Sequence, residues 1–469
     1  MHTARETSNS ANTVSRPQSV GKSWLVWLCL LNLAGADEPP STRDRLLVRP
    51  SDDRQPVNVK EIEKLGIQLF ESRRLKLFTD IEAESAKPLP PLADQAFDEF
   101  EKYFGKLPPA ADGEEFQING FLIKDKEKFR EAGLLREELR DQLHGRQIGY
   151  QFWMMEQPSD YYRRHLLLHE FTHTFMQAIP RAIVPVAYLE GMAEHFGTHR
   201  LSADGRLTLR IMPHNRADFR GHDRLFLIRQ YVRDRGVPEL LDLLNWEPST
   251  FRIFNDSYPL AWGACVFLDL HPHTRDRFRR TARSLTDPQA WEKFEEQLQP
   301  DGADILTEWT LFAAEAWEEF DFDRMAIEFR AGQRLSELAH DADKPFRVEI
   351  RSNRGWQSSE VLVEKGRSYD LRATGRFTLA DKPKPWASEA DGITFRYHNG
   401  RPLGQLLGAI RAIEKVDGEP ESMLTVHSLA TKIRFEAPRT GTLYLRLNDH
   451  PGELTDNKGT VLVEFREAD

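Results

Sequence analysis

Cysteine is nearly absent from this sequence, which has 2 cysteines among 469 residues. Cys29 lies in an apolar run near the N-terminus, so Cys265 alone remains for the body of the chain. Disulfide bonds therefore do not hold the fold together, and burial of apolar surface has to stabilise it, for which a chain of this length is sufficient. Cys265 lies within the apolar stretch LAWGACVFLDL, and we predict a buried side chain rather than a nucleophile.

Long blocks of basic residues are also missing. The 64 Lys and Arg residues are outnumbered by 74 Asp and Glu residues, and no run of Lys and Arg is long enough to follow a phosphate backbone. We therefore expect no nucleic acid partner. With 40% apolar and 10% aromatic residues, the composition is that of a globular protein.

Apolar runs long enough to span a bilayer are absent as well. The strongest run, Ser23 to Ala36, has about a dozen apolar residues, follows Arg16 and Lys22, and ends in Ala34-Gly35-Ala36. We predict a signal peptide over residues 1–36 with cleavage after Ala36. The alternative is an uncleaved N-terminal anchor. Either reading predicts an exported protein, which is periplasmic, on the cell surface or secreted.

The spacing of apolar residues divides the rest of the chain. Residues 37–58 are rich in Pro, Asp, Ser and Arg and predict a flexible lead-in. Residues 59–342 begin with short strand-like runs and become mostly helical from Ala187, which predicts a small mixed sheet followed by a helical subdomain. After the sequence DADKP, alternating apolar residues predict an all-β domain over residues 343–469.

The sequence His169-Glu170-Phe171-Thr172-His173 is an HExxH motif. Residues i and i+4 share one face of a helix, so both imidazoles can reach one zinc ion, while Glu170 points at the metal-bound water as a general base. The flanking residues Leu166 to Leu168, Phe171 and Phe175 are apolar, which indicates a buried and rigid helix. The alternative, a solvent-facing helix with two incidental histidines, would have polar neighbours.

A catalytic zinc site also needs a third protein ligand and an open position for water. The segment Ala187 to His195, AYLEGMAEH, supplies candidates, among them His195. His165 is another, because it lies one turn before His169 on the same helix face.

The sequence LEGMAEHF, about seventeen residues after HExxH, resembles the third-ligand helix of the gluzincins, the metallopeptidase clan that includes thermolysin and aminopeptidase N. The resemblance covers roughly Val59 to Phe320 and implies an α+β zincin-like catalytic domain. It also implies that Glu190 is the third zinc ligand and that Glu194 orients a ligand histidine. The alternative for Glu194 is a solvated helix carboxylate.

Tyr258, which opens the helix-like sequence SYPLAWGACVFL, resembles the tyrosine at this place in exported bacterial proteins with a peptidase-like domain of this clan. The resemblance implies that Tyr258 stabilises the oxyanion; the alternative is a core tyrosine with a locally bonded hydroxyl. The Gly-x-Met-Glu-Asn exopeptidase motif of aminopeptidase N is not present, so endopeptidase action is preferred.

Residues from about Phe346 to Phe465 resemble the calcium-dependent galactose-binding lectins of the LecA type, a small β-sandwich. The likeness is clearest in FEAPRTGTLYLRLNDHPGELTDNKGTVLVEF. It implies a calcium site with side-chain oxygens from Asp449, Asp456 and Asn457 and a backbone carbonyl from Glu453. The alternative is an Asx turn without metal. Ser388 to Asp391 stand where these lectins place sugar-contacting His and Gln, which argues against galactose specificity.

Two hypotheses follow from these patterns. The first is an exported zinc peptidase that cleaves a peptide or protein substrate, while its lectin-like domain binds a glycan or cell-wall ligand. The second is a non-catalytic carbohydrate- or wall-binding protein with a degenerate zinc domain. The intact Glu170 favours the first, because a degenerate domain has no need of a general base.

Overall fold

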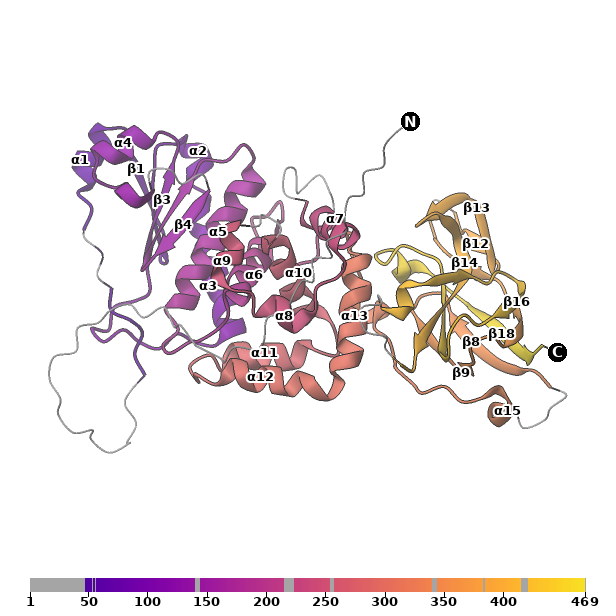
Figure 1. The fold of residues 1–469 in the computed structure, drawn as a ribbon. Helices are drawn as coiled ribbons and strands as arrows, with labels where there is room; N and C mark the ends of the chain where they lie inside the picture. The colour runs from indigo at the N-terminus through magenta and orange to yellow at the C-terminus, as the bar shows by residue number, and fades with distance from the viewer. Residues whose placement is uncertain are drawn as a thin grey trace, which may run out of the picture. The chain divides into compact units, whose positions relative to one another are not determined.

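A mixed five-stranded sheet with the strand order β1-β2-β3-β5-β4 begins the fold (Figure 1). The computed structural model describes residues 47–52, 54, 56–139, 144–214, 223–253, 257–339, 344–382, 384–414 and 421–468. β2, β3 and β5 are parallel, and β1 and β4 pair antiparallel at the two edges. The strands are β1 (Gln68–Glu71), β2 (Leu75–Thr79), β3 (Ile118–Ile123), β4 (Gly145–Ile148) and β5 (Gln151–Met155).

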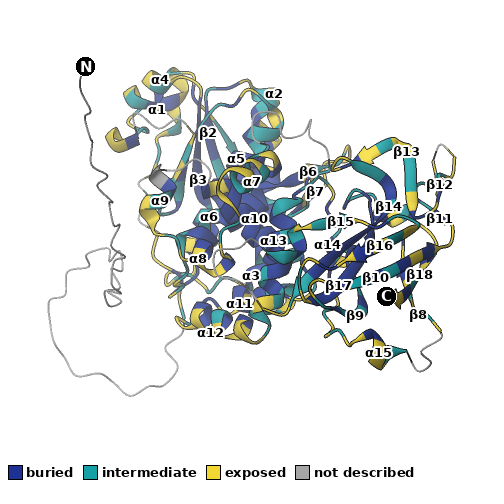
Figure 2. Cartoon of the chain, turned by 45° about the vertical axis from the view of Figure 1, so that its right-hand side comes forward, coloured by how far each residue is buried: buried dark blue, intermediate teal, exposed yellow. Residues whose placement is uncertain are grey.

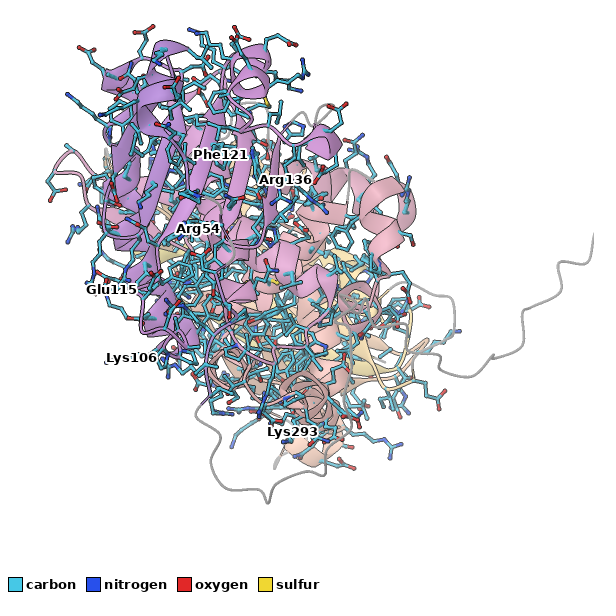
Figure 3. All side chains as sticks on the ribbon, turned by 90° about the vertical axis from the view of Figure 1, so that its left-hand side faces the viewer. Arg54, Lys106, Glu115, Phe121, Arg136 and Lys293 are labelled. Atoms are coloured by element: carbon cyan, nitrogen blue, oxygen red, sulfur yellow. The ribbon has the colours of Figure 1, made fainter. Side chains whose placement is uncertain are left out.

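Each face of this sheet packs against helices. On one face, Phe121 of β3, labelled in Figure 3, stacks on Trp153 of β5 with ring centroids 5.2 Å apart. Ile62 and Phe129 belong to the same hydrophobic cluster. These two come from α1 (Val59–Lys64) and α4 (Lys126–Glu131). The other face contacts α3 (Leu89–Phe104) and α5 (Asp160–Gln177), which share the main hydrophobic core. Within the sheet, β4 and β5 contact α5.

The chain from α6 onward is mostly helical. α6 (Val186–Gly197) packs on both α5 and α10. The remaining helices of this part are α2 (Ala83–Ala86), before α3, and α7 (Arg224–Arg235), α8 (Leu240–Leu244), α9 (Pro248–Ile253), α10 (Ser257–Leu270), α11 (Arg275–Arg283), α12 (Ala290–Leu298), α13 (Gly302–Ala314), α14 (Phe322–Met325) and α15 (Leu335–Leu338). A hairpin of β6 (His199–Leu201) and β7 (Leu207–Leu209) interrupts them. The apolar spacing does not predict this hairpin, because its strands are only three residues long.

The C-terminal part is antiparallel β structure in two main sheets, with the orders β16-β10-β18-β8 and β13-β14-β17-β9. β15 pairs with β14, and β11 with β12. The strands are β8 (Phe346–Arg351), β9 (Gln357–Val363), β10 (Ser368–Thr374), β11 (Phe377–Thr378), β12 (Ala387–Ser388), β13 (Asp391–His398), β14 (Arg401–Ala412), β15 (Val426–Ser428), β16 (Lys432–Glu436), β17 (Gly441–Leu447) and β18 (Thr460–Glu467). Buried residues of the main sheets form one hydrophobic cluster. Figure 2 colours buried residues dark blue along both sheets.

The predicted fold class is confirmed: a small mixed sheet, then helices, then antiparallel β structure. The predicted signal peptide, the start of the lead-in and the boundary near residue 343 lie outside the described residues. None of the helices in the described part of the chain is long and apolar enough to cross a membrane.

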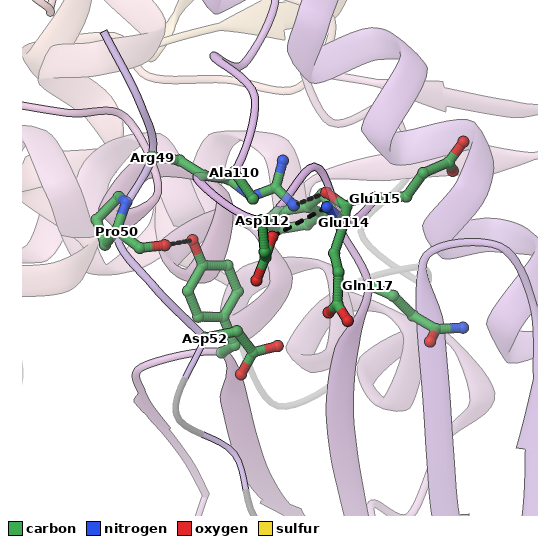
Figure 4. A pocket seen from close by; sticks show the side chains of 10 residues that line it. Arg49, Pro50, Asp52, Ala110, Asp112, Glu114, Glu115 and Gln117 are labelled. Atoms are coloured by element: carbon green, nitrogen blue, oxygen red, sulfur yellow. Dashed lines mark hydrogen bonds between the residues drawn. The ribbon is translucent and has the colours of Figure 1, made fainter. Parts of the chain in front are cut away.

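Arg49 and Pro50, from the later part of the predicted lead-in, line a small pocket with Tyr150 (Figure 4). The Tyr150 hydroxyl donates to the Pro50 carbonyl at 2.7 Å, and the backbone N–H of Arg49 donates to the Pro109 carbonyl at 3.1 Å. These bonds attach the segment to the sheet domain.

Candidate metal centre

α5 carries the HExxH motif on a helix that is fixed at several points. The Ser159 hydroxyl caps its N-terminus by accepting a hydrogen bond from the Tyr162 N–H. Phe171 and Phe175 pack on Phe100 of α3 with ring centroids 5.5 and 5.1 Å apart. The apolar face of α5 is therefore used for packing, as its sequence predicts, and the histidines occupy the face toward α6.

α6 brings Glu190 to the histidines, and Gly191 makes this approach possible. A Cβ at Gly191 would lie 2.4 Å from the Ala261 carbonyl oxygen of α10 and 2.6 Å from Cys265 Sγ. Only glycine lets the backbone of α6 sit this close to α10. Cys265 is fully buried in this contact, and burial raises the pKa of its thiol well above the ordinary value, which agrees with a packing role.

The three predicted zinc ligands converge. Nε2 of His173 lies 3.1 Å from Nε2 of His169 and 3.2 Å from Oε2 of Glu190, and the remaining side, from His169 Nε2 to Glu190 Oε2, is 3.5 Å. Ligand atoms bound at about 2.0–2.1 Å around a tetrahedral zinc ion lie about 3.3 Å from one another. The donor triangle thus has the dimensions that a zinc ion requires.

The charge of Glu190 suits a cation. Burial alone would raise the pKa of this carboxyl, but the neighbouring His173 and His169 lower it overall, far below its ordinary value. Glu190 is therefore a carboxylate at neutral pH. Among the described residues, this group of potential ligands contains two histidines and one glutamate, and no fourth side chain of the kinds that bind zinc.

Glu194 lies one turn further along α6 and faces His169 from the other side of the ring. Its Oε1 is 3.1 Å from His169 Nδ1, and its Oε2 is 3.3 Å from His165 Nε2. Glu194 is buried and is not the solvated carboxylate of the alternative reading. His165, His169 and Glu194 thus form a second buried His-His-Glu group close enough to hold a metal.

Arg224, at the start of α7, reaches into this second group. Its Nη2 lies 2.9 Å from His165 Nε2 and also contacts Glu194 Oε2. The guanidinium is buried, so a fixed positive charge already faces Glu194. Sequence reasoning did not find Arg224, which follows Glu194 by thirty residues and belongs to no local pattern.

Glu170 is buried, with 4% of its surface exposed. Burial is the main cause that raises the pKa of this carboxyl above its ordinary value, and the charges of the nearby histidines oppose it. A Cβ at Gly145 of β4 would lie 2.2 Å from Glu170 Oε1, so the carboxylate rests against the bare backbone of this strand. Gly145 is a second residue that sequence reasoning missed.

Tyr258 is the second residue of α10 and is 36% exposed. Partial burial raises the pKa of its hydroxyl above the ordinary value, and the negative charges of Glu190 and Glu170 raise it further. Tyr258 therefore lies within electrostatic reach of both carboxylates, with its ring edge against Phe251. The remaining rival ligand, His195, shares a hydrogen bond of 3.0 Å between its Nε2 and Asp269 Oδ2, which makes it a structural residue.

The predicted calcium residues lie in the loop between β17 and β18. Asn457 Nδ2 donates to Asp449 Oδ2 at 2.7 Å, and Asp456 Oδ2 accepts from the Asp381 N–H at 3.2 Å. Asn457 Oδ1 is buried and has no hydrogen-bond partner among the described residues. Burial raises the pKa of Asp449 to about 7. A buried carboxylate beside an unused amide oxygen fits a hard cation.

Glu453 lies in the same loop. Its carboxylate binds Arg396, with both oxygens 2.8 Å from Nη2. The side chain of Glu453 is thus engaged with Arg396, and its role as a backbone ligand stays a prediction.

Comparison with known proteins finds a structural match for part of the chain. No protein-family model matches the chain, and no curated protein matches it. The C-terminal region matches the solved structure of the EclA N-terminal domain, a PllA-like lectin, at 16% identity and a TM-score of 0.20. The match covers 26% of this chain and 95% of the lectin domain.

Proposed function

We propose that this chain is an exported zinc-dependent peptidase of the gluzincin type, with endopeptidase action preferred. The donor triangle of His169, His173 and Glu190, with sides of 3.1, 3.2 and 3.5 Å, carries the proposal. Three protein ligands leave one position of a tetrahedral ion open, as in catalytic rather than structural zinc sites.

This triangle is a better zinc site than the group of His165, His169 and Glu194. Arg224 already contacts both His165 and Glu194, and a divalent cation would have to displace or tolerate this buried charge. Glu194 then has a different role. Its carboxylate, 3.1 Å from His169 Nδ1, fixes the ring and leaves Nε2 to face the ion.

Bound zinc would supply a Lewis acid that lowers the pKa of water and polarises a substrate carbonyl. Glu170 would take the proton from the attacking water, since its raised pKa brings it nearer to neutral pH. Tyr258 would donate a hydrogen bond to the oxygen on which charge develops, for which a protonated phenol is required. Glu170 would then pass its proton to the leaving amine.

The position of β4 favours a peptide as substrate. β4 ends the sheet and pairs only with β5 among the described strands, and Gly145 on this strand touches Glu170. An extended peptide that added to the outer edge of β4 would run past the general base. The exposed Arg146 on the same strand is close enough to influence both Glu170 and Tyr258 electrostatically.

The C-terminal β domain would act as an accessory domain that binds a glycan or cell-wall ligand with calcium at Asp449, Asp456 and Asn457. The unused Asn457 Oδ1 beside buried Asp449 supports the cation. Calcium should raise the thermal midpoint of the wild-type chain, and this rise should disappear in Asp449→Asn, because one charged ligand is lost. A rise of equal size in both proteins would contradict the site.

Substitution of Glu170→Gln tests the peptidase proposal. Glutamine has the size of glutamate but cannot accept the proton, so zinc content should equal that of the wild type while hydrolysis of a broad peptide pool falls by at least about 100-fold. Glu99→Gln, in α3, is the matched control, because the Glu99 side chain is 37% exposed and pairs only with Lys102 on the same helix among the described residues. If zinc-loaded wild-type protein cleaves nothing in the pool, the binding-protein hypothesis replaces the peptidase.

A further inference from the structure

A third cluster of potential metal ligands lies outside the centre on α5 and α6. His271 and His273 belong to the turn that joins α10 to α11, and Glu308 comes from α13. His271 Nε2 lies 3.2 Å from Glu308 Oε1, and His273 Nδ1 lies 2.9 Å from Glu308 Oε2. The donor atoms of all three residues lie within 4.8 Å of one another. The peptidase proposal gives this cluster no role.

Two of the three side chains are held in place. Glu308 and His271 are buried, and Glu308 Oε1 also accepts the backbone N–H of Ile327 at 2.7 Å. The His271 ring packs against Phe267 and Phe322, with centroids 4.9 and 6.2 Å away. A carboxylate and an imidazole are thus already placed side by side, which reduces the ordering that an incoming ion would demand.

His273 is the residue through which an ion can reach the cluster from solvent. Its side chain is 38% exposed, so it can rotate toward an ion and leave a coordination position open to water. Two charged groups near His273 are each already paired: Arg277 with Asp301 at 2.8 Å, and Asp304 with Arg411. These pairs offset each other, so the carboxylate of Glu308 supplies the negative charge that a cation would meet.

We propose that His271, His273 and Glu308 form a second site for a divalent cation of the zinc type. Imidazole nitrogens with one carboxylate favour zinc over calcium or magnesium, which prefer oxygen ligands. To bind an ion through the nitrogen that faces Glu308, each imidazole must carry its proton on the other ring nitrogen. His271 Nδ1 then loses the long 3.3 Å bond that it accepts from the His273 N–H, and the bonds to the ion replace it.

The site would link α10, α13 and the segment that follows α14. Ile327, which bonds to Glu308, packs in a cluster with Trp356, Leu407 and Tyr444 of the β domain. A bound ion would therefore connect α10, α13 and the segment after α14 close to the start of the β domain. We expect it to stabilise the fold and to take no part in hydrolysis.

His273→Asn separates metal binding from hydrogen bonding. Asparagine Nδ2 stands where histidine Nδ1 stands, so it can still donate to Glu308, but an amide nitrogen does not bind zinc. The experiment uses the full chain in the Glu190→Ala background, which lacks the α6 ligand, and measures zinc content and the zinc-induced rise in thermal midpoint. His427→Asn, a half-buried histidine of β15, is the control.

We expect Glu190→Ala protein to retain about one equivalent of zinc and to gain at least about 3 °C in thermal midpoint with excess zinc. Both effects should vanish on adding His273→Asn and persist on adding His427→Asn. If zinc content and midpoint shift are the same with and without the His273→Asn substitution, the second site is overturned and the cluster consists of hydrogen bonds alone. Failure of the peptidase proposal would instead show as unchanged zinc content in Glu190→Ala.

Discussion

The contact between Gly145 and Glu170 predicts a substitution that should impair catalysis without touching the metal. A Cβ at residue 145 would lie 2.2 Å from Glu170 Oε1, 2.8 Å from Cδ and 3.0 Å from Cγ. Non-bonded carbon and oxygen atoms approach to little less than about 3.2 Å, so in Gly145→Ala the carboxylate must move by about 1 Å. Gly145 does not have a positive φ, so alanine adds no backbone strain.

The expected loss follows from this displacement. A misplacement of about 1 Å at a catalytic group can cost about 100-fold in rate, which corresponds to about 2.7 kcal/mol of transition-state stabilisation. kcat/KM for a peptide that the wild type cleaves should therefore fall by about 100-fold. Zinc content should not change, because His169, His173 and Glu190 lie outside the contact.

Gly302→Ala is the matched control. A Cβ at Gly302, the first residue of α13, meets nothing within 4 Å, and this residue also lacks a positive φ. Its activity should equal that of the wild type. If Gly145→Ala keeps kcat/KM within about twofold of the wild type, Glu170 does not act from its position against β4. If Gly145→Ala loses zinc, the loss of activity comes from disturbed zinc ligands and not from Glu170.

Three further predictions concern other parts of the fold. Glu190→Ala should lower the zinc content of the dialysed protein by about one equivalent, because a charged ligand is removed; unchanged zinc content would exclude Glu190. Arg446 donates two hydrogen bonds of 2.8 and 2.9 Å to the buried Glu315 carboxylate. Arg446→Met should therefore lower the free energy of unfolding in urea by roughly 3–5 kcal/mol, because it leaves the Glu315 charge without its partner. Adding Glu315→Leu should restore most of this free energy. Burial lowers the pKa of His398 from 6.5 to about 4, and its charged neighbours are Glu315, Arg446, His450 and Arg396. Because the unfolded chain binds this proton at a higher pH than the folded chain, the free energy of unfolding should fall by up to roughly 3 kcal/mol as the pH drops from about 6.5 to 4. In His398→Asn, the free energy of unfolding should depend less on pH over this range.

The convergence of the candidate metal ligands was largely predictable because helix geometry relates them. His169 and His173 are four residues apart, so the helix alone places both on one face. The prediction of Glu190 also required that a second helix pack against α5. The residues around Glu190 indicated this helix, because they resemble the third-ligand helix of the gluzincins. In each case, the residues that must meet are either close together in the sequence or part of a pattern that recurs in a family.

Gly145 and Arg224 were not predictable for the opposite reason. Gly145 matters only because β4 crosses the face of α5 that bears Glu170, and the sequence GRQI of β4 has no apolar alternation to indicate a strand. Arg224 matters because the start of α7 comes to lie beside Glu194 and His165. Such contacts depend on tertiary packing, which residue spacing does not encode.

Gly191 shows how packing and chemistry depend on one position. A glycine inside a helix costs about 1 kcal/mol relative to alanine, so its presence between Glu190 and Glu194 requires a reason. The reason is the Ala261 carbonyl, which a Cβ would approach to 2.4 Å. Because α6 can lie against α10 only at this spacing, the same glycine that weakens the helix sets the depth at which Glu190 meets the two histidines. Gly191 therefore belongs both to the segment that resembles a ligand motif and to the contact between α6 and α10. A substitution of Gly191 would change the packing and the position of Glu190 together.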